Sequence, residues 1–131
     1  SSRGRYAVMA LADIARFEPR NPIPLRDISL RQGISLVYLE QLFLKLKKNK
    51  IVLSVRGKNG GYVLNKSAKD IKISEVFLAV EEKVKTIGCE KHSRKGCNGK
   101  SSKCITHNLW DELENYINDF FERKTLKDLI N

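Results

Sequence analysis

Gly33 lies between two stretches in which apolar residues recur at helical spacing, and this arrangement constrains the fold more than any other feature. We predict a short helix at residues 25–32 and a longer one after Ser35, whose hydroxyl is suited to capping a helix N-terminus. Glycine permits the tight turn that must join them. Two helices joined in this way form a helix-turn-helix. The longer helix carries five apolar residues on one face: Leu36, Leu39, Leu42, Phe43 and Leu46.

Two β-prone segments follow, at residues 51–56 and 62–64. The linker between them contains three glycines, which tolerate the positive φ angles of a hairpin tip. A helix-turn-helix followed by a basic two-stranded hairpin is a winged helix. Further helices are expected at residues 5–17, at 74–82 with Ser74 as N-cap, and at 107–123.

The positive charge is concentrated in the first half of the chain. Residues 1–66 carry 13 Lys/Arg and 4 Asp/Glu, a net charge of +9, whereas residues 67–131 carry 12 and 11, a net charge of +1. A basic half that contains a winged helix indicates binding to a polyanion, and we expect double-stranded DNA. A generally basic surface is the alternative.

Several polar side chains lie off the apolar face of the helix after Ser35. Gln41 is suited to bidentate hydrogen bonding with adenine in a major groove, and Arg56 to insertion into a narrow minor groove. An ordinary exposed surface is the alternative for both. The remaining DNA-binding candidates are Arg3, Ser35, Tyr38, Lys45 and Lys58.

Glu40 is an acidic residue on this otherwise basic surface. A carboxylate that faces phosphates weakens binding, so a DNA-binding protein is expected to keep one there only to select between sites. The alternative is that Glu40 pairs with Lys47, Lys48 or another neighbour in the helix.

All three cysteines and both histidines fall within residues 89–107, in a stretch rich in Gly, Ser, Asn and Lys. Such a loop offers thiols no packing role, and three thiolates with one imidazole are ligands of zinc or of an iron–sulfur cluster. The spacing Cys89-x7-Cys97-x6-Cys104 is wider than is usual for structural zinc, and favours a cluster.

His107 follows the last cysteine by three residues and is the expected fourth ligand, with His92 as the competing candidate. Seven Lys/Arg in residues 83–103 can offset the negative charge of three thiolates around a cluster and lower the pKa of the thiols. Three unligated, redox-active cysteines are the alternative.

The helix at residues 107–123 carries seven apolar residues, a wider stripe than packing against one neighbour requires. It either lies in a groove of its own domain or pairs with its copy. We expect a symmetric homodimer, which would bind near-palindromic DNA. The expected dimer interface has the seam spacing of a helix pair: Leu109, Leu113, Tyr116 and Phe120.

The expected fold class is mainly α with a small β-hairpin. We divide the chain into a winged helix-turn-helix DNA-binding region at 1–82, a cysteine-rich cluster-binding loop at 83–106, and a long dimerisation helix with a tail at 107–131. No apolar run reaches the length of a membrane span, no signal peptide opens the chain, and the cysteine number is odd. We therefore expect a cytoplasmic protein without a membrane partner. The first residue is Ser1, so the natural start is expected to be missing.

Six motifs extend over nearly the whole chain. They are Gly4-Arg5-Tyr6-Ala7-Val8, Arg31-Gln32-Gly33-Ile34-Ser35, Tyr38-Leu39-Glu40-Gln41-Leu42-Phe43, Ser54-Val55-Arg56-Gly57, Gly60-Gly61-Tyr62 and Cys104-x-Thr106-His107-x-Leu109-Trp110. Together they resemble the family of IscR-type iron–sulfur cluster regulators, which are winged-helix transcriptional repressors. The chain departs from that family in its longer cysteine gaps, in Lys58-Asn59 at the hairpin tip, and in Val37, where a base-contacting serine is usual.

The resemblance implies a homodimer in which each subunit carries a [2Fe–2S] cluster. It also implies that the cluster-loaded form represses cluster-assembly genes, while the cluster-free form binds a second class of site. In the family, the residue matching Glu40 selects between the two classes, and those matching Gln41 and Arg56 touch bases. Broader relatives bind [4Fe–4S] clusters and respond to nitric oxide or iron. The implied ligands are Cys89, Cys97, Cys104 and His107.

Other classes of protein would share some of these features. A zinc-storage or redox protein with an incidental basic face would explain the cysteines, and a structural RNA-associated protein would explain the charge. An enzyme is not expected, because no nucleophile–base pair or pair of acids appears outside the cysteine loop. No small-molecule substrate is expected either.

Overall fold

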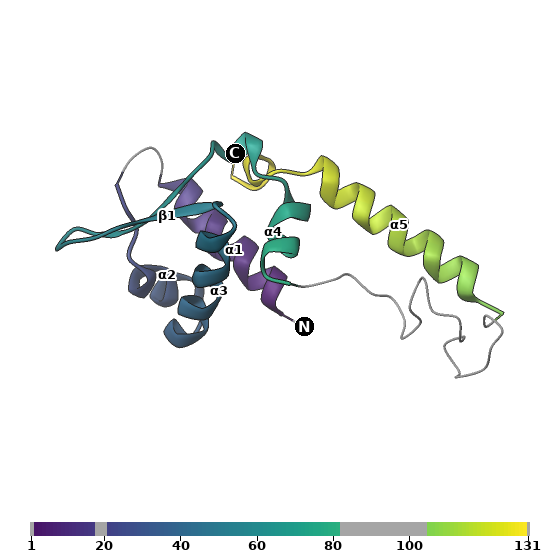
Figure 1. Cartoon of the computed structure of the whole chain (residues 1–131), viewed down its shortest axis with the longest axis horizontal. Coiled ribbons are helices and arrows are strands. Elements are labelled where there is room, and N and C mark those ends of the chain that lie inside the picture. The colour runs from purple at the N-terminus through teal and green to yellow at the C-terminus, as the bar shows by residue number, and fades with distance from the viewer. Residues whose placement is uncertain (1, 18–20, 82–104, 131) are drawn as a thin grey trace.

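The computed structural model describes residues 2–17, 21–81 and 105–130. Its longer elements are α1 (Arg3–Arg16), α2 (Leu25–Gln32), α3 (Leu36–Lys48), β1 (Val52–Val55), β2 (Gly61–Leu64), α4 (Ile73–Ala79) and α5 (His107–Arg123) (Figure 1). Two short 3-10 helices, η1 (Ala68–Asp70) and η2 (Leu126–Leu129), complete the order. The predicted fold, mainly α with a small hairpin in a winged helix-turn-helix, is confirmed.

The turn between α2 and α3 is formed as its residues predict. Gly33 adopts the left-handed conformation, with φ of 67°. The Ser35 hydroxyl accepts a hydrogen bond from the backbone N–H of Tyr38 at 3.3 Å and so caps α3.

The strands β1 and β2 pair in antiparallel register, with Val52 opposite Leu64 and Val55 opposite Gly61. The hairpin is tied to the body because the backbones of Ile23 and Tyr62 exchange hydrogen bonds of 3.0 and 2.9 Å. Gly61 lies against the Ile23 backbone at φ of 154°, so a Cβ at this position would overlap that backbone. The glycine therefore allows the wing to approach the helices closely.

One hydrophobic core lies among α1, α2, α3, α4 and the C-terminal tail. Its fully buried side chains include Leu11, Ile28, Leu39, Phe43, Leu46, Val76 and Leu126. Because Leu126 follows α5, the chain returns to the winged-helix core after the helix that leaves it (Figure 1).

Four helix boundaries differ from those predicted. α1 ends at Arg16 rather than at residue 17, and α4 ends at Ala79 rather than at residue 82. α1 begins at Arg3 rather than at residue 5. α4 begins at Ile73, so Ser74 is inside the helix and does not cap it; that expectation was wrong. The physical reason is tertiary: the Ile73 N–H donates to the carbonyl of Lys124 at 2.9 Å, which fixes the start of α4 against the segment after α5.

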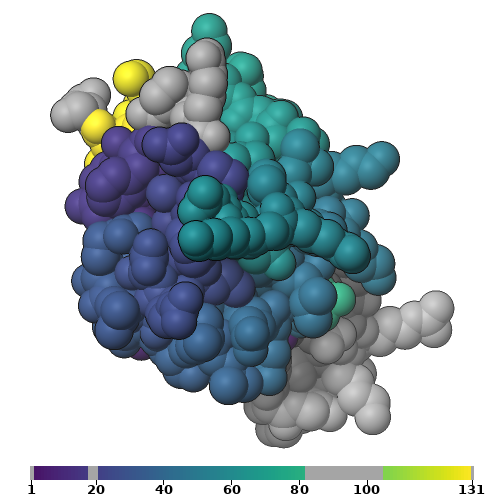
Figure 2. All heavy atoms as spheres, turned by 90° about the vertical axis from the view of Figure 1, so that its left-hand side faces the viewer, coloured from purple at the N-terminus to yellow at the C-terminus, as the bar shows by residue number. Residues whose placement is uncertain are grey.

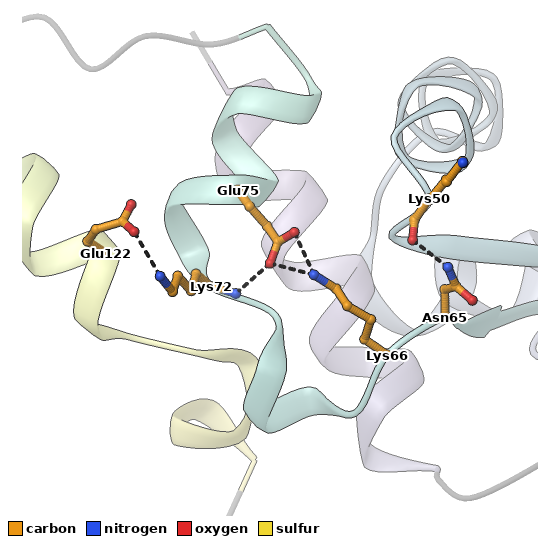
Figure 3. Close-up of polar contacts among 6 residues, drawn as sticks. All are labelled: Lys50, Asn65, Lys66, Lys72, Glu75 and Glu122. Atoms are coloured by element: carbon orange, nitrogen blue, oxygen red, sulfur yellow. Dashed lines mark hydrogen bonds and ion pairs between the residues drawn. The ribbon is translucent and has the colours of Figure 1, made fainter.

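Polar contacts join the ends of these elements in Figure 3. The Glu75 carboxylate accepts hydrogen bonds from the backbone N–H of Lys72 at 3.1 Å and from the ammonium of Lys66 at 2.8 and 3.0 Å. The Lys72 ammonium pairs with Glu122 of α5 at 3.0 Å. Since these pairs are exposed, they orient the segments more than they stabilise them.

The helix α5 leaves the body of the molecule. Its C-terminal end packs on α4, where the rings of Phe77 and Phe121 are 4.7 Å apart. Its N-terminal end projects away from the other helices (Figure 1). No helix in the described ranges is long and apolar enough to cross a bilayer.

Candidate nucleic-acid interface and metal ligand

The helix α3 is exposed to solvent on the side away from the core. Its core-facing residues are buried, whereas Gln41 and Glu40 are exposed. Gln41 is therefore free to reach a ligand from the outer side of the helix. Its placement agrees with the prediction that it reads a base, although the contact itself remains a prediction.

Tyr38 and Lys45 lie on the flank of α3 that faces the rest of the protein. The Tyr38 ring packs edge-on against Tyr6 of α1, with ring centroids 5.8 Å apart. The Lys45 ammonium pairs with the Glu81 carboxylate at 3.0 Å. Tyr38 and Lys45 therefore hold α3 against its neighbours, and any contact that they make with phosphate is in addition to this role.

Glu81 connects three elements just after α4. Its backbone has φ of 61°, and its carbonyl accepts a hydrogen bond from the Arg3 guanidinium at 3.5 Å. The hydrogen bond from Lys45, together with the charges of Lys45 and Arg3, lowers the pKa of the Glu81 carboxyl. Sequence reasoning missed Glu81, because nothing in its local pattern signals a partner 36 residues earlier.

Glu40 is on the opposite flank, beside a hollow of about 530 Å³ between α3 and β2. It makes no ion pair with any residue in the described ranges. The alternative role, an ion pair with Lys47 or Lys48, is therefore wrong. The carboxylate is left at the edge of the surface that Gln41 occupies.

Arg56 and Lys58 are exposed in the hairpin, next to the end of β1. The hairpin extends past the helices at the left of Figure 1. The wing thus carries two exposed cations, and Figure 2 shows the teal hairpin next to the blue residues of the helix-turn-helix.

His107 is the first residue of α5 and only 8% of it is exposed. Its Nδ1 atom is buried and has no hydrogen-bond partner in the part of the chain that the structure describes. A buried polar atom without a partner is costly and calls for an explanation, and a metal ligand is one. The predicted ligands Cys89, Cys97 and Cys104, and the competing His92, lie outside the described residues.

The start of α5 is held by Thr106 and Trp110. The Trp110 indole donates a hydrogen bond to the Thr106 hydroxyl at 3.0 Å, and the Trp110 backbone N–H donates to the Thr106 carbonyl at 3.2 Å. These two motif residues therefore fix the first turn of the helix that positions the imidazole of His107.

The four predicted interface residues of α5 are exposed in the single chain. The exposed fractions are 58% for Leu109, 41% for Leu113, 65% for Tyr116 and 50% for Phe120. The alternative that α5 buries this seam in a groove of its own domain is wrong. The described residues leave this seam uncovered, whereas Trp110, Ile117 and Phe121 are half-buried.

The comparisons with known proteins agree with this architecture. The Rrf2 profile, described as an iron-dependent transcriptional regulator, matches residues 1–131. The chain belongs to the Rrf2 family. It is 50% identical over 131 residues to the HTH-type transcriptional regulator IscR of Pectobacterium carotovorum, spanning all of this chain and 78% of that protein, and 49% identical over the same spans to IscR of Photorhabdus laumondii.

Solved structures lead to the same family. T. potens IscR superposes with a TM-score of 0.78 at 32% identity, covering 98% of this chain and 83% of that one. CymR, the global cysteine regulator of B. subtilis, superposes with a TM-score of 0.81 at 25% identity, covering 99% and 94%. This Rrf2 protein is thus a DNA-binding transcriptional regulator of the IscR type.

Proposed function

We propose that this Rrf2 protein senses an iron–sulfur cluster and, as a homodimer on near-palindromic operator DNA, represses genes of cluster assembly. The observation that carries the proposal is the buried Nδ1 of His107 at the start of α5, which has no hydrogen-bond partner among the residues that the structure describes. An imidazole ligates a metal through an unprotonated ring nitrogen, and a nitrogen kept from water and from donors is suited to that use.

The residues present fit a cluster. His107 lies three residues after Cys104, and Cys89 and Cys97 supply two more thiolates. Three thiolates and one imidazole make four ligands, which suits a [2Fe–2S] cluster; a [4Fe–4S] cluster is the alternative. When bound, such a cluster supplies a redox-active group whose presence reports the state of cluster supply.

The exposed seam of α5 supports the homodimer. Four large apolar side chains on one face of a projecting helix have no cover in the described part of the chain. Pairing with a second copy would bury them symmetrically, since both copies present the same seam. Two α3 helices would then meet two half-sites related by a near-palindrome.

The proposed DNA contacts follow from position. Gln41 would read an adenine from the outer side of α3, and Arg56 would enter the minor groove from the wing. Phosphate contacts orient such a complex without reading sequence. The residues proposed to hold the backbone are Arg3, Ser35, Tyr38, Lys45 and Lys58.

The link between sensing and reading is proposed to run through Glu81. This residue directly precedes the segment that contains the cysteines, and its carboxylate is bound to Lys45 of α3. Asn49, at the end of the same helix, donates to the carbonyl of Ala79 at 3.4 Å. A shift at the end of α4 would therefore move α3 directly, and a state-dependent contact of this kind can change DNA affinity.

Iron and sulfide content after anaerobic purification tests the proposal. We expect equal iron and sulfide with a visible chromophore in the wild type, near-complete loss of both in Cys97→Ala, and a labile chromophore in His107→Ala. His92→Ala is the matched control and should behave as wild type. Wild-type protein without iron and sulfide would exclude the cluster. Full iron and sulfide in Cys97→Ala would exclude Cys97 as a ligand, and damage in His92→Ala alone would make His92 the ligand.

A further inference from the structure

The outer side of α3 carries two exposed apolar residues that the core does not use. Val37 is 63% exposed and Leu44 is 68% exposed, whereas Leu39, Leu42, Phe43 and Leu46 of the same helix are buried. Seven residues is nearly two full helical turns, so Val37 and Leu44 project in almost the same direction. Gln41 lies between them on the same outer side.

The surroundings of these two side chains favour a polyanion over an apolar protein surface. Lys45, Lys47 and Lys48 lie in the last turn of the helix, and the exposed cations Arg56 and Lys58 are on the neighbouring hairpin. Desolvating this many cations against an apolar partner would be unfavourable, whereas phosphates would pair with them. The two apolar side chains are therefore isolated apolar groups on a basic surface that suits DNA.

The major groove contains one apolar group, the C5-methyl of thymine. We infer that Val37 and Leu44 determine specificity by contacting thymine methyl groups on either side of the base pair that Gln41 reads. This inference rests on the proposed mode of DNA binding. The same side chains would disfavour cytosine at these positions, because its N4 amino group would be left facing a hydrocarbon without an acceptor.

The spacing makes the inference specific. Val37 and Leu44 are separated by about 10 Å along the helix axis, at a rise of roughly 1.5 Å per residue. For an axis lying along the groove, this separation corresponds to about three base pairs, at roughly 3.4 Å each. We therefore expect two thymine positions about three base pairs apart, with an adenine between them.

The experiment removes only the methyl groups. Duplexes are selected from a randomised library by the wild-type protein purified anaerobically, and the selected duplex is resynthesised with deoxyuridine in place of each thymine in turn. Removing one methyl contact should weaken binding roughly three- to fivefold. Val37→Ser should abolish the sensitivity at one position, and Leu44→Ser the sensitivity at the other.

Two further variants serve as controls. Leu30→Ser removes a leucine of α2 that is 78% exposed and should keep the uracil sensitivity at both positions. Gln41→Ala should lose the preference for adenine but keep both thymine effects.

Wild-type binding that is indifferent to uracil would overturn the inference. Uracil sensitivity that is undiminished in both serine variants would also overturn it. If both variants bind every duplex as the wild type does, the outer side of α3 would instead be assigned to a protein partner. If the wild type selects no sequence at all, the proposed mode of DNA binding fails with it. A selected sequence without a methyl effect would overturn this inference alone.

Discussion

Arg31 donates two hydrogen bonds to the buried carboxylate of Asp13, from Nη2 to Oδ1 at 2.7 Å and from Nε to Oδ2 at 3.0 Å. Gln32 donates a third, at 2.8 Å, and the Arg31 guanidinium also lies over the ring of Phe17 at 4.5 Å. Asp13 belongs to α1, and Arg31 ends α2 just before the turn at Gly33. The motif residues Arg31 and Gln32 thus hold the helix-turn-helix against α1.

Replacing Asp13 with Asn should destabilise the fold. The side chain is only 1% exposed, and breaking a buried, hydrogen-bonded ion pair lowers the free energy of unfolding by about 3 kcal/mol. Arg16→Ala is the matched control. Arg16 binds the same carboxylate at 3.2 Å but its side chain is half-exposed, so its loss should cost at most about 1 kcal/mol. Urea denaturation of the three proteins measures both effects, and equal losses would contradict this account.

Stability should also depend on pH through Asp13. Burial acts to raise the pKa of this carboxyl, but hydrogen bonds from Arg31 and Gln32 and the charges of Arg31 and Arg16 together lower it below its ordinary value of 3.8. A carboxyl whose pKa is lower in the folded state stabilises the fold above its unfolded pKa, and this contribution is lost as the pH falls through the folded pKa. The stability difference between wild type and Asp13→Asn should therefore be constant near neutral pH and shrink below about pH 4. A difference that stays constant down to pH 2 would exclude this role for Asp13.

The exposed seam of α5 predicts that two charges will separate the dimer. Leu113→Asp with Phe120→Asp places carboxylates where the two copies would meet, and we expect monomers by sedimentation. Affinity for a near-palindrome should fall far more than affinity for a half-site. Asn115→Asp with Asn118→Asp adds the same charge on the other side of α5 and should leave the dimer intact. If the variant with Leu113→Asp and Phe120→Asp stays dimeric, the interface lies elsewhere.

Glu40 should make the choice of operator depend on the cluster. Its carboxylate lacks an ion-pair partner in the described ranges and lies beside the residues that we propose to contact DNA. We expect Glu40→Ala to let the cluster-free protein bind operators that the wild type binds only when loaded, with little change in the loaded form. Anaerobic binding isotherms of both forms at one salt concentration measure this. Equal gains in the two forms would reduce Glu40 to a repulsive charge.

Lys50 has a backbone conformation that disfavours its own side chain. Its φ is 62°, just after the end of α3, and its carbonyl accepts a hydrogen bond from the Asn65 amide at 2.8 Å (Figure 3). A left-handed conformation costs a residue with a Cβ roughly 1–2 kcal/mol, so Lys50→Gly should stabilise the fold by up to about 1 kcal/mol. Lys48→Gly, within the helix, should instead destabilise it by a similar amount. Thermal melts measure both effects, and equal shifts in Tm for the two variants would contradict the strain at Lys50.

Local order in this chain was determined by the sequence alone. The apolar spacing of residues 25–32 and 36–46, the cap at Ser35 and the glycines of the hairpin predicted α2, the start of α3 and the strands of the wing to within a residue. These features are encoded over a few neighbouring residues, because helix and strand periods and turn chemistry act at short range. The expected interface on α5 was likewise visible as a repeat, although the sequence alone left open whether its own domain covers it.

The tertiary structure determines which side chains of different elements pair with one another. Asp13 meets Arg31 across 18 residues, Lys45 meets Glu81 across 36, and the start of α4 is set by a carbonyl from the segment after α5. Only the folded chain brings such groups within hydrogen-bond distance, since nothing in a short window specifies a partner from another element. The same holds for exposure: Val37 and Leu44 are ordinary helix residues in the sequence. Only the packing of Leu39, Phe43 and Leu46 into the core turns them outward, toward the surface where we place the DNA.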